Sequence, residues 1–430
     1  MGGAGAARGG AGRVAGGACA PVGPDMARAV TTAHDQGAAR MATIIEPMLD
    51  VLRFCQAQRE WAASLTRSLA SLESPTNDKC AVDRCGLEIE RQLASMGGRV
   101  TRLPRTDAGD HLLAEFGCGE RQLLLLCHFD TVWELGQINR MPLVERDGRL
   151  HGPGVFDMKG GLVIALLALR AVTELGLDPK RRLVLLCTTD EETGSHSSRQ
   201  AIENEARRSD AALVLEPALP GGAVKTSRKG VGVFDLRVDG VPAHAGADPA
   251  RGASAVLELA HQIVALDALQ EPSRGLSVNV GVIGGGTRSN VVAERAAAEI
   301  DLRVTHMDDA ERMERAIRGL VPRNPRAKLT VTGGINRPPM ERTAGVAHLY
   351  AEAKAVAADL GFVLEEGGTG GASDGNFTGA LGVPTLDGLG AEGDGAHAID
   401  EHVIIESLPR RAALLAGLMV RLGERLSTTP

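Results

Sequence analysis

Short apolar runs alternate with helical stretches along the middle of this chain, and this alternation most limits the folds that it can adopt. Residues 121–127, 181–189 and 211–215 are typical of buried strands, whereas residues 160–175 and 201–210 have helical patterns. Strands that alternate with helices in short units form a parallel sheet with helices on both faces. We therefore expect an α/β fold built on a mainly parallel sheet.

Polar side chains come directly after each of these predicted strands. His128 follows the first strand, Glu191 and Glu192 follow the second, and Glu216 follows the third. In open parallel sheets, ligands bind beyond the carboxyl ends of the strands. We expect these polar residues, which are distant in sequence, to converge in one site.

The carboxylates of Asp190, Glu191 and Glu192 crowd the end of one predicted buried strand. Adjacent like charges repel one another and are costly to remove from water. Either solvent covers them, or a positive group lies beside them. Neighbouring side chains on an extended backbone point in opposite directions. Glu191 and Glu192 therefore have different tasks: one can bind a metal ion while the other acts as a base.

Each motif that carries these residues has an ordinary structural explanation when it is taken alone. An HxD sequence is usually a hydrogen-bonded pair, a Gly-rich stretch can be a turn or an anion nest, and DEETG can be a solvated helix start. Imidazole and carboxylate together are ligands for zinc, and for manganese or cobalt. Five such motifs in order favour a divalent metal pair that neutralises the crowded acids; they cover residues 128–132, 152–161, 190–195, 215–218 and 395–403.

The chain has 430 residues, a length that suggests two domains or one domain with an insertion. Residues 1–41 are mostly glycine and alanine without a pattern, which predicts a disordered tail. Residues 42–228 and 340–430 are expected to form the α/β domain. Alternating, half-exposed strands predict an α+β insertion over residues 229–339.

The composition excludes several classes of partner. The formal net charge is −7 and the basic residues are scattered, which argues against a nucleic-acid or an anionic membrane surface. No apolar run approaches the roughly 20 residues that span a bilayer. The seven cysteines are odd in number and contain no CxxC, which favours a reducing cytoplasm.

The five motifs resemble those of the dizinc exopeptidases and deacylases, a family that includes glutamate carboxypeptidase, acetylornithine deacetylase, succinyl-diaminopimelate desuccinylase and aminoacylase. The resemblance runs from about Glu46 to the C-terminus, and residues 194–218 are most similar to the glutamate carboxypeptidase branch. It implies two divalent ions, zinc or else cobalt or manganese. The implied roles are His128 and Glu216 on one ion, Glu192 and His397 on the other, Asp157 as a bridge with a cis bond to Met158, Asp130 as the group that orients His128, and Glu191 as the general base.

The same resemblance implies that the insertion is a lid and dimerisation domain. His244 would reach the active site of the partner subunit and stabilise the oxyanion there. Asn290 and Arg303 would contact substrate, the arginine through a free carboxylate. Gly371 lies in a Gly-rich loop, residues 367–376, that would shape the pocket.

Together these features predict a cytoplasmic, homodimeric, two-zinc hydrolase. It would remove a C-terminal amino acid, for which glutamate is a candidate, from a small peptide or an N-acyl amino acid. Lys225 and Arg337 are candidates for recognising a glutamate side chain. The alternative is a biosynthetic deacylase that acts on acetylornithine or succinyl-diaminopimelate. A non-catalytic binding protein on the same fold is a remote alternative, because every required position has the expected residue type.

Overall fold

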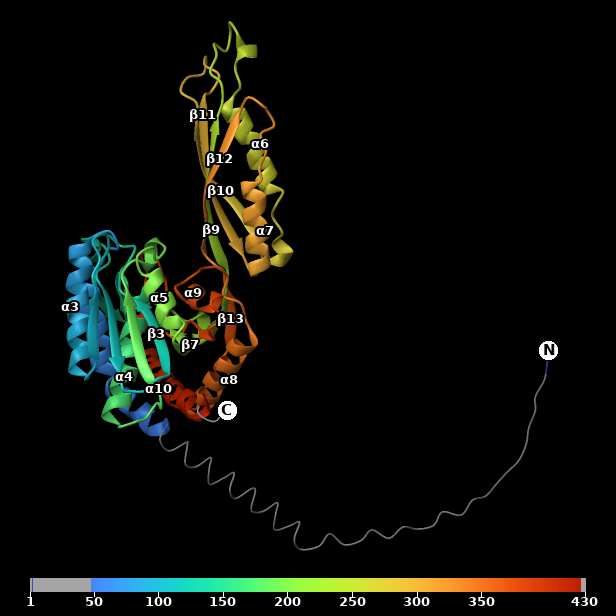
Figure 1. The fold of residues 1–430 in the computed structure, drawn as a ribbon. Helices are drawn as coiled ribbons and strands as arrows, with labels where there is room; N and C mark the ends of the chain where they lie inside the picture. Colours follow the sequence, from blue (N-terminus) through green and yellow to red (C-terminus); the bar gives the residue numbers. More distant parts are fainter. Residues whose placement is uncertain (1, 3–47, 427–430) are drawn as a thin grey trace. The chain divides into compact units, whose positions relative to one another are not determined.

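The computed structural model describes residue 2 and residues 48–426 (Figure 1). The predicted disordered tail, residues 1–41, lies outside these residues apart from Gly2. The domain boundaries after residues 228 and 339 stay predictions. Within residues 48–426, no helix is both long enough and apolar enough to cross a membrane.

A six-stranded sheet carries the α/β part of the chain, in the order β1–β2–β6–β3–β7–β14. Strands β6, β3, β7 and β14 are parallel, which confirms the expected α/β fold. Strands β1 and β2 pair antiparallel and were not predicted. Strand β1 lies at the edge, and its mostly exposed side chains have no apolar pattern, whereas β2 is largely buried between β1 and β6. The strands are β1 Arg99–Leu103, β2 His111–Phe116, β3 Gln122–His128, β6 Arg182–Thr188, β7 Ser209–Val214 and β14 Thr385–Leu386.

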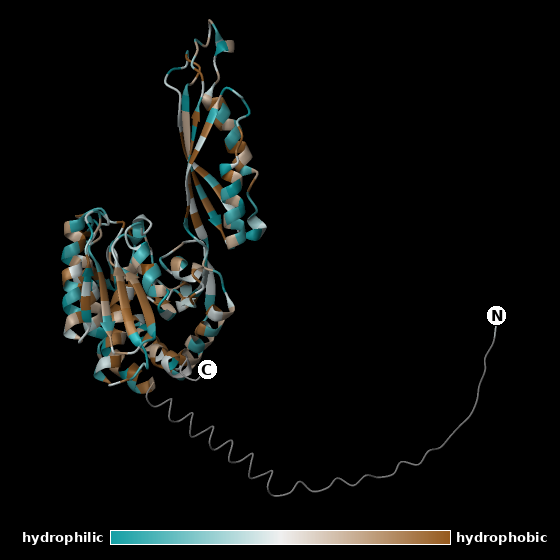
Figure 2. Ribbon diagram, in the orientation of Figure 1, coloured by the Kyte–Doolittle hydropathy of each residue, from teal (hydrophilic) through white to brown (hydrophobic). Residues whose placement is uncertain are grey.

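Alternate side chains of the buried strands pack against different helical layers. Leu123 and Leu125 of β3 belong to one core cluster, whereas Leu124 and Leu126 belong to a second. Figure 2 shows the central strands as hydrophobic, as expected when both faces of a parallel sheet are covered. The first cluster includes α2 (Arg59–Ser71), α3 (Lys79–Ser95), α4 (Gly160–Glu174), α8 (Ala344–Asp359) and α10 (Ser407–Leu426), and the second includes α5 (Arg199–Ala206) and α9 (Gly375–Ala380).

The three predicted strands with polar ends are neighbours in the sheet, with β3 between β6 and β7. Their register aligns the carboxyl ends: His128 lies opposite Thr188 on β6, and Leu126 lies opposite Val214 on β7. The residues that follow these strands therefore leave the sheet at the same edge. This alignment gives the physical basis for a shared site.

A four-stranded antiparallel sheet, in the order β10–β11–β9–β12, has a core of its own (Figure 1). Its side chains alternate between buried and exposed, because α6 and α7 pack on one face only. Strand β12 was not predicted; its residues are partly exposed and include two glycines. The elements are β9 Gly230–Asp239, α6 Ala255–Asp267, β10 Ser277–Gly285, β11 Arg295–Val304, α7 Met307–Arg318 and β12 Lys328–Arg337.

Short strands complete the α/β part. One small sheet has the order β15–β16–β5–β4, and β8 pairs in parallel with β13. The strands are β4 Val144–Arg146, β5 Arg149–His151, β8 Val224–Arg228, β13 Glu366–Thr369, β15 Gly393–Asp394 and β16 His402–Ile404.

Candidate metal centre

Asp157 lies in an irregular turn between β5 and α4, and its peptide bond to Met158 is cis, as the family resemblance implied. The Glu401 carboxylate accepts hydrogen bonds from three backbone N–H groups of this turn, those of Gly154, Phe156 and Asp157, at 2.9, 2.9 and 3.1 Å. It also accepts a bond from the indole of Trp133. The turn that presents Asp157 is therefore held by one buried side chain from the C-terminal part.

Asp157 lies between two histidines that are far apart in sequence. Its Oδ1 is 3.3 Å from Nε2 of His128, and its Oδ2 is 3.4 Å from Nε2 of His397. Glu216 lies on the first side, with Oε1 3.6 Å from His128 Nε2. Glu192 lies on the second, with Oε2 3.1 Å from His397 Nε2. The structure thus brings the five predicted ligands together as two histidine–carboxylate pairs that share Asp157, a set that we call the His–carboxylate cluster.

Several buried atoms of this cluster have no hydrogen-bond partner. They are Nε2 of His128, Oδ1 of Asp157 and Oε1 of Glu192. One donor atom from each of these residues lies within 4.8 Å of the others. Buried polar atoms are nearly always satisfied, and imidazole nitrogen and carboxylate oxygen are the atoms that bind zinc and similar ions. The cluster therefore fits divalent cations.

Excess negative charge shapes the protonation of the cluster. The carboxylates of Asp157 and Glu192 raise the pKa of His397 to about 10. Burial opposes a charged His128, but Asp130 and Asp157 outweigh it and hold the pKa of this imidazole well above its usual value. Burial also raises the pKa of Glu216 to about 7. The carboxylates thus favour positive charge at this place, which bound divalent cations would supply.

Asp130 orients His128, as expected for the second ring nitrogen of a metal-binding histidine. The Oδ1 atom of Asp130 is 3.3 Å from Nδ1 of His128, and its backbone carbonyl lies at 3.1 Å. The hydroxyl of Thr76 donates to Asp130 Oδ2 at 2.8 Å. Because Nδ1 is engaged in this way, the ring turns Nε2 toward Asp157.

Arg228 is a contact of the cluster that the sequence reasoning missed. It donates two hydrogen bonds to Asp387, at 2.7 and 2.9 Å, and a longer one of 3.4 Å to Oε2 of Glu216. All three side chains are buried. The guanidinium of Arg228 holds Glu216 in position. The residues next to Arg228 in the sequence form no motif from which this role could have been predicted.

Glu191 points to a different set of partners from Glu192. Its Oε1 lies 2.9 Å from Nη2 of Arg337, which also donates to the backbone carbonyl of Glu191. Nη1 of Arg337 donates to Asp374 at 2.7 Å, and Nη2 reaches the hydroxyl of Ser195. Burial raises the pKa of Glu191 well above its usual value, and Arg337 opposes that shift. Glu191 is thus a partly buried carboxylate beside the cluster, and its partner is the cation of Arg337.

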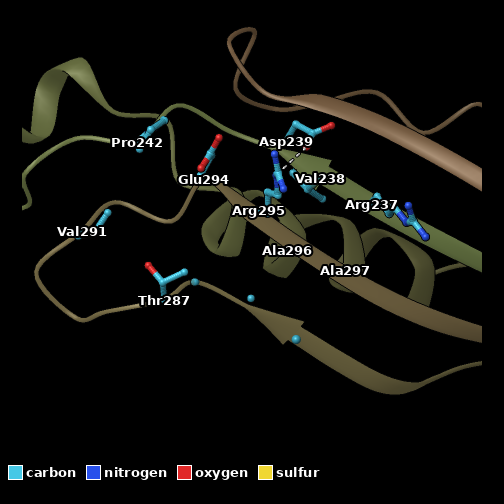
Figure 3. A pocket seen from close by; sticks show the side chains of 13 residues that line it. Arg237, Val238, Asp239, Pro242, Thr287, Val291, Glu294, Arg295, Ala296 and Ala297 are labelled. Atoms are coloured by element: carbon cyan, nitrogen blue, oxygen red, sulfur yellow. Dashed lines mark ion pairs between the residues drawn. The ribbon is translucent and has the colours of Figure 1, made fainter.

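His244 and Asn290 lie on neighbouring loops beyond the four-stranded sheet. His244 bridges to Val291, and the N–H of Ala245 donates to the carbonyl of Asn290 at 3.0 Å. A pocket of about 510 Å³ lies between these loops and the sheet, with Pro242 and Val291 among its lining residues (Figure 3). Within residues 48–426, no hydrogen bond or ion pair joins His244 or Asn290 to the His–carboxylate cluster.

The remaining predicted substrate contacts are Arg303, Gly371 and Lys225. Arg303 makes two bonds of 2.8 Å to Asp301 on its own strand. The carbonyl of Gly371 accepts a bond from Arg228. Lys225 is buried, and desolvation lowers the pKa of its ammonium group. No hydrogen bond or ion pair joins that ammonium to another side chain in the described part of the chain.

Comparisons with known proteins agree with this geometry. The sequence matches Peptidase family M20/M25/M40 over residues 124–421. It is 29% identical over 363 residues to carboxypeptidase G2 of Pseudomonas sp. (strain RS-16), a match that covers 83% of this chain and 88% of that protein.

Solved structures share the fold. Aminopeptidase PepT of Bacillus cereus aligns with a TM-score of 0.71 at 20% identity, covering 85% of this chain and 98% of that one. The YXEP protein of Bacillus subtilis, a dinuclear metal binding peptidase from the M20 family, aligns with a TM-score of 0.64 at 16% identity, covering 86% and 99%. The family resemblance noted in the sequence is confirmed. This chain belongs to Peptidase family M20/M25/M40, and it is a metal-dependent hydrolase.

Proposed function

We propose that the protein uses two divalent metal ions, zinc in the first instance and cobalt or manganese as alternatives, to remove a C-terminal glutamate from a small peptide or an N-acyl amino acid. The observation that carries this proposal is the position of Asp157, with one carboxylate oxygen toward each histidine. A carboxylate shared in this way suits two ions better than one. When bound, such ions polarise the scissile carbonyl and make an attacking water more acidic.

Glu191 is the general base in this proposal. Its carboxylate takes the proton from the attacking water and passes it to the nitrogen of the leaving amino acid. Arg337 holds the carboxylate in position through the 2.9 Å ion pair. Glu192 binds one of the metal ions in this proposal, because its carboxylate lies beside His397 of the cluster.

Recognition of the leaving amino acid needs cations. Lys225 is our candidate for the glutamate side chain, since its buried ammonium makes no hydrogen bond or ion pair with another side chain among residues 48–426 and lies near Arg228, Asp387 and Glu216. Arg337 is a weaker candidate, because Glu191, Asp374 and Ser195 already occupy its nitrogens.

A homodimer is part of the proposal. Arg303 lies near one end of β11, and Asn290 precedes the other end, which begins at Arg295. Arg295 is eight residues from Arg303, or about 26 Å along a strand. One small substrate cannot contact both within a single chain, so a partner subunit would supply His244 and Asn290 to a site that contains Arg303.

The surface for such a partner is exposed on the four-stranded sheet. Strand β10 is an edge strand, and its Val282 and Ile283 are 55% and 64% exposed. On α6, Leu257 and Val264 are 59% and 71% exposed. Unpaired edges and apolar patches of this kind are typical of interfaces.

A reducing compartment, the cytoplasm, completes the proposal. Six of the seven cysteines lie in the described part of the chain, and all six are free. Cys127 and Cys187 remain unbonded although their sulfur atoms are 3.4 Å apart. Thiols this close favour a location where disulfides do not accumulate.

The second candidate function is a biosynthetic deacylase. The 29% identity to carboxypeptidase G2 favours C-terminal cleavage over that alternative. Zinc-loaded protein should be assayed with N-benzoyl-glutamate, peptides that have a C-terminal glutamate, N-acetylornithine and N-succinyl-diaminopimelate. We expect the highest kcat/KM for substrates that end in glutamate, with free glutamate as a product. Faster cleavage of N-acetylornithine or N-succinyl-diaminopimelate, or release of the N-terminal residue from the peptides, would contradict the proposal.

A further inference from the structure

One carboxylate and two imidazoles form a row across the small sheet β15–β16–β5–β4. His402 on β16 lies directly opposite Asp394 on β15 and directly opposite His151 on β5. Side chains of directly opposite residues lie on the same face of a sheet, with their Cβ atoms about 4.5–5.5 Å apart. The fold therefore places these three side chains side by side, a set that we call the Asp–His–His row.

The row lies on the outer face of this sheet. Leu150 and Val403, which are the neighbours of His151 and His402 along their strands, are fully buried in the main core cluster. Successive side chains of a strand point to opposite faces, so the row points away from that core. His151 is half-buried and Asp394 is exposed. An ion from solvent can therefore reach the row.

The two imidazoles are spaced as ligands of one ion would be. The ring centroids of His151 and His402 are 5.1 Å apart, and the ring planes are tilted by 37°. A tetrahedral ion that lies about 2.0–2.1 Å from one nitrogen of each ring holds the ring centres about 5 Å apart. Rings at this separation can bind one ion through side-chain rotation, without movement of the backbone.

The ring nitrogens of the row are available to an ion. Nδ1 of His402 lies 2.9 Å from the backbone carbonyl of Asp400. A carbonyl only accepts hydrogen bonds, so Nδ1 carries the proton and Nε2 has a free lone pair. Within residues 48–426, Nε2 of His402 and both ring nitrogens of His151 have no hydrogen-bond partner. Metal-binding histidines donate their second N–H to a carbonyl or carboxylate in the same way.

The charges beside the row keep His151 neutral. Burial, His402 and the cations of Arg146 and Arg149 lower the pKa of His151, whereas Asp147 opposes them. The imidazole of His151 is therefore neutral at pH 7, which is the form that binds metal ions. The two arginines also repel a cation. We therefore expect weaker binding at the row than at the His–carboxylate cluster.

We propose that the Asp–His–His row is a further metal site, separate from the His–carboxylate cluster, for a divalent ion that prefers imidazole, such as zinc, copper or nickel. His151 and His402 each supply one nitrogen, and Asp394 supplies a carboxylate oxygen. Water completes the coordination of the ion.

An ion in the row joins three strands that lead to the active site. Strand β5 runs into the turn that presents Asp157, and β16 begins directly after Glu401, which holds that turn. Strand β15 ends three residues before His397. An ion that binds only the folded chain stabilises it by mass action. The inference therefore goes beyond the proposed function, because this ion stabilises the segments around the cluster and does not act on the substrate.

Zinc binding to matched variants tests the inference. Zinc-loaded proteins are dialysed against increasing free zinc, and bound zinc is measured by elemental analysis. Wild type should bind one ion per chain more than His151→Phe, which keeps a ring beside His402 but has no nitrogen ligand. His348→Phe is the control, because His348 is an exposed histidine on α8 outside the row. That variant should bind as much zinc as wild type.

Asp394→Asn tests the carboxylate of the row. Its affinity for the additional ion should fall by about tenfold or more, because even changes behind the metal ligands cost about 10–100-fold in affinity. Asp394 is exposed, so this variant is informative even if His151→Phe does not fold. The midpoint of thermal unfolding gives a second readout: additional zinc should raise it in wild type and in His348→Phe, but not in His151→Phe.

The outcomes are distinct from those of the proposed function. Equal zinc binding by wild type and His151→Phe would overturn the site, and so would an equal loss in His348→Phe. Unchanged zinc affinity in Asp394→Asn would also overturn the site as proposed. The comparison is between variants that share the His–carboxylate cluster, so it does not depend on the number of ions that the cluster holds or on the substrate that it cleaves.

Discussion

Nη2 of Arg337 lies 2.9 Å from Oε1 of Glu191. The same guanidinium bonds Asp374 and Ser195, and its plane lies over the ring of Phe377, with 5.0 Å between the guanidinium carbon and the ring centroid. A buried cation with this many partners has little freedom to rotate. Arg337 therefore fixes the side chain that we propose as the general base.

Replacing Arg337 with methionine should lower kcat by about 10²-fold, because a misplaced catalytic group can cost that much. In a Glu191→Gln background the same replacement should change kcat little, since the group that it positions no longer takes a proton. Steady-state kinetics on the four proteins of this cycle make the measurement. Arg199→Met is the control: Arg199 also lies over Phe377, at 4.9 Å, but does not contact Glu191. Equal losses in both backgrounds would show that Arg337 acts independently of Glu191.

Removing one partner of a buried ion pair typically destabilises a protein by about 3–5 kcal/mol. Urea unfolding must therefore accompany the kinetics of Arg337→Met. Arg337→Lys keeps the positive charge and should recover part of the lost activity. Its recovery would separate positioning of Glu191 from a general loss of folding.

The metal centre predicts an order of metal loss. Zinc-loaded wild type should hold about two ions per chain, because a single ion would leave part of the crowded carboxylate set unneutralised. Asp157→Ala should lose more metal than His128→Ala or His397→Ala, since Asp157 lies beside both histidines. Elemental analysis after gel filtration makes the measurement. Similar metal content in all three variants would contradict a bridging role for Asp157.

Glu191 and Glu192 should respond differently to the same change. Glu191→Gln keeps the size of the side chain but removes the proton acceptor, so metal content should persist while kcat falls by about 10²–10⁴-fold. Glu192→Gln should weaken one metal site, because Glu192 contacts His397. Metal titration and kinetics on both variants show which glutamate binds metal and which acts as the base. Loss of metal from Glu191→Gln together with retention by Glu192→Gln would reverse the two roles.

The sequence predicted the parts of the fold and site that depend on local pattern. The apolar runs before His128 and Glu216 became β3 and the parallel strand β7, and the polar residues after them converge because neighbouring parallel strands end together. The antiparallel strand β1 was missed because it is an edge strand without an apolar run, and β2 was missed although it lies between β1 and β6 and is largely buried.

The second layer of the site could not be predicted from the sequence. Glu401 lies in the motif of residues 395–403, which was interpreted through His397. The hydrogen-bond partners of Glu401 are backbone N–H groups near Asp157, which this motif does not indicate. Arg228 meets Asp387 across 159 residues. Such contacts depend on where the backbone passes in three dimensions, and residue type alone gives no sign of them.

The proposed dimer predicts that two inactive proteins can restore one another. His244→Ala chains lack the group that we assign to the partner's site, and Glu191→Gln chains lack the base. A heterodimer of the two would have one site with neither substitution and one site with both. Chain exchange must first be shown with differently tagged chains, after mild denaturation if the dimer is stable.

With random pairing, heterodimers make up half of the dimers, and each has one intact site. Recovered activity should therefore approach about a quarter of the wild-type specific activity if distant sites act independently. Mixing His244→Ala chains with chains that carry both substitutions is the control, because no pairing then gives a site free of substitution. Exchange without recovered turnover would mean that His244 acts in its own subunit or outside catalysis. Recovered activity would place the loops of His244 and Asn290 at the active site of the neighbouring chain. This is expected if the two ends of β11 serve two different active sites.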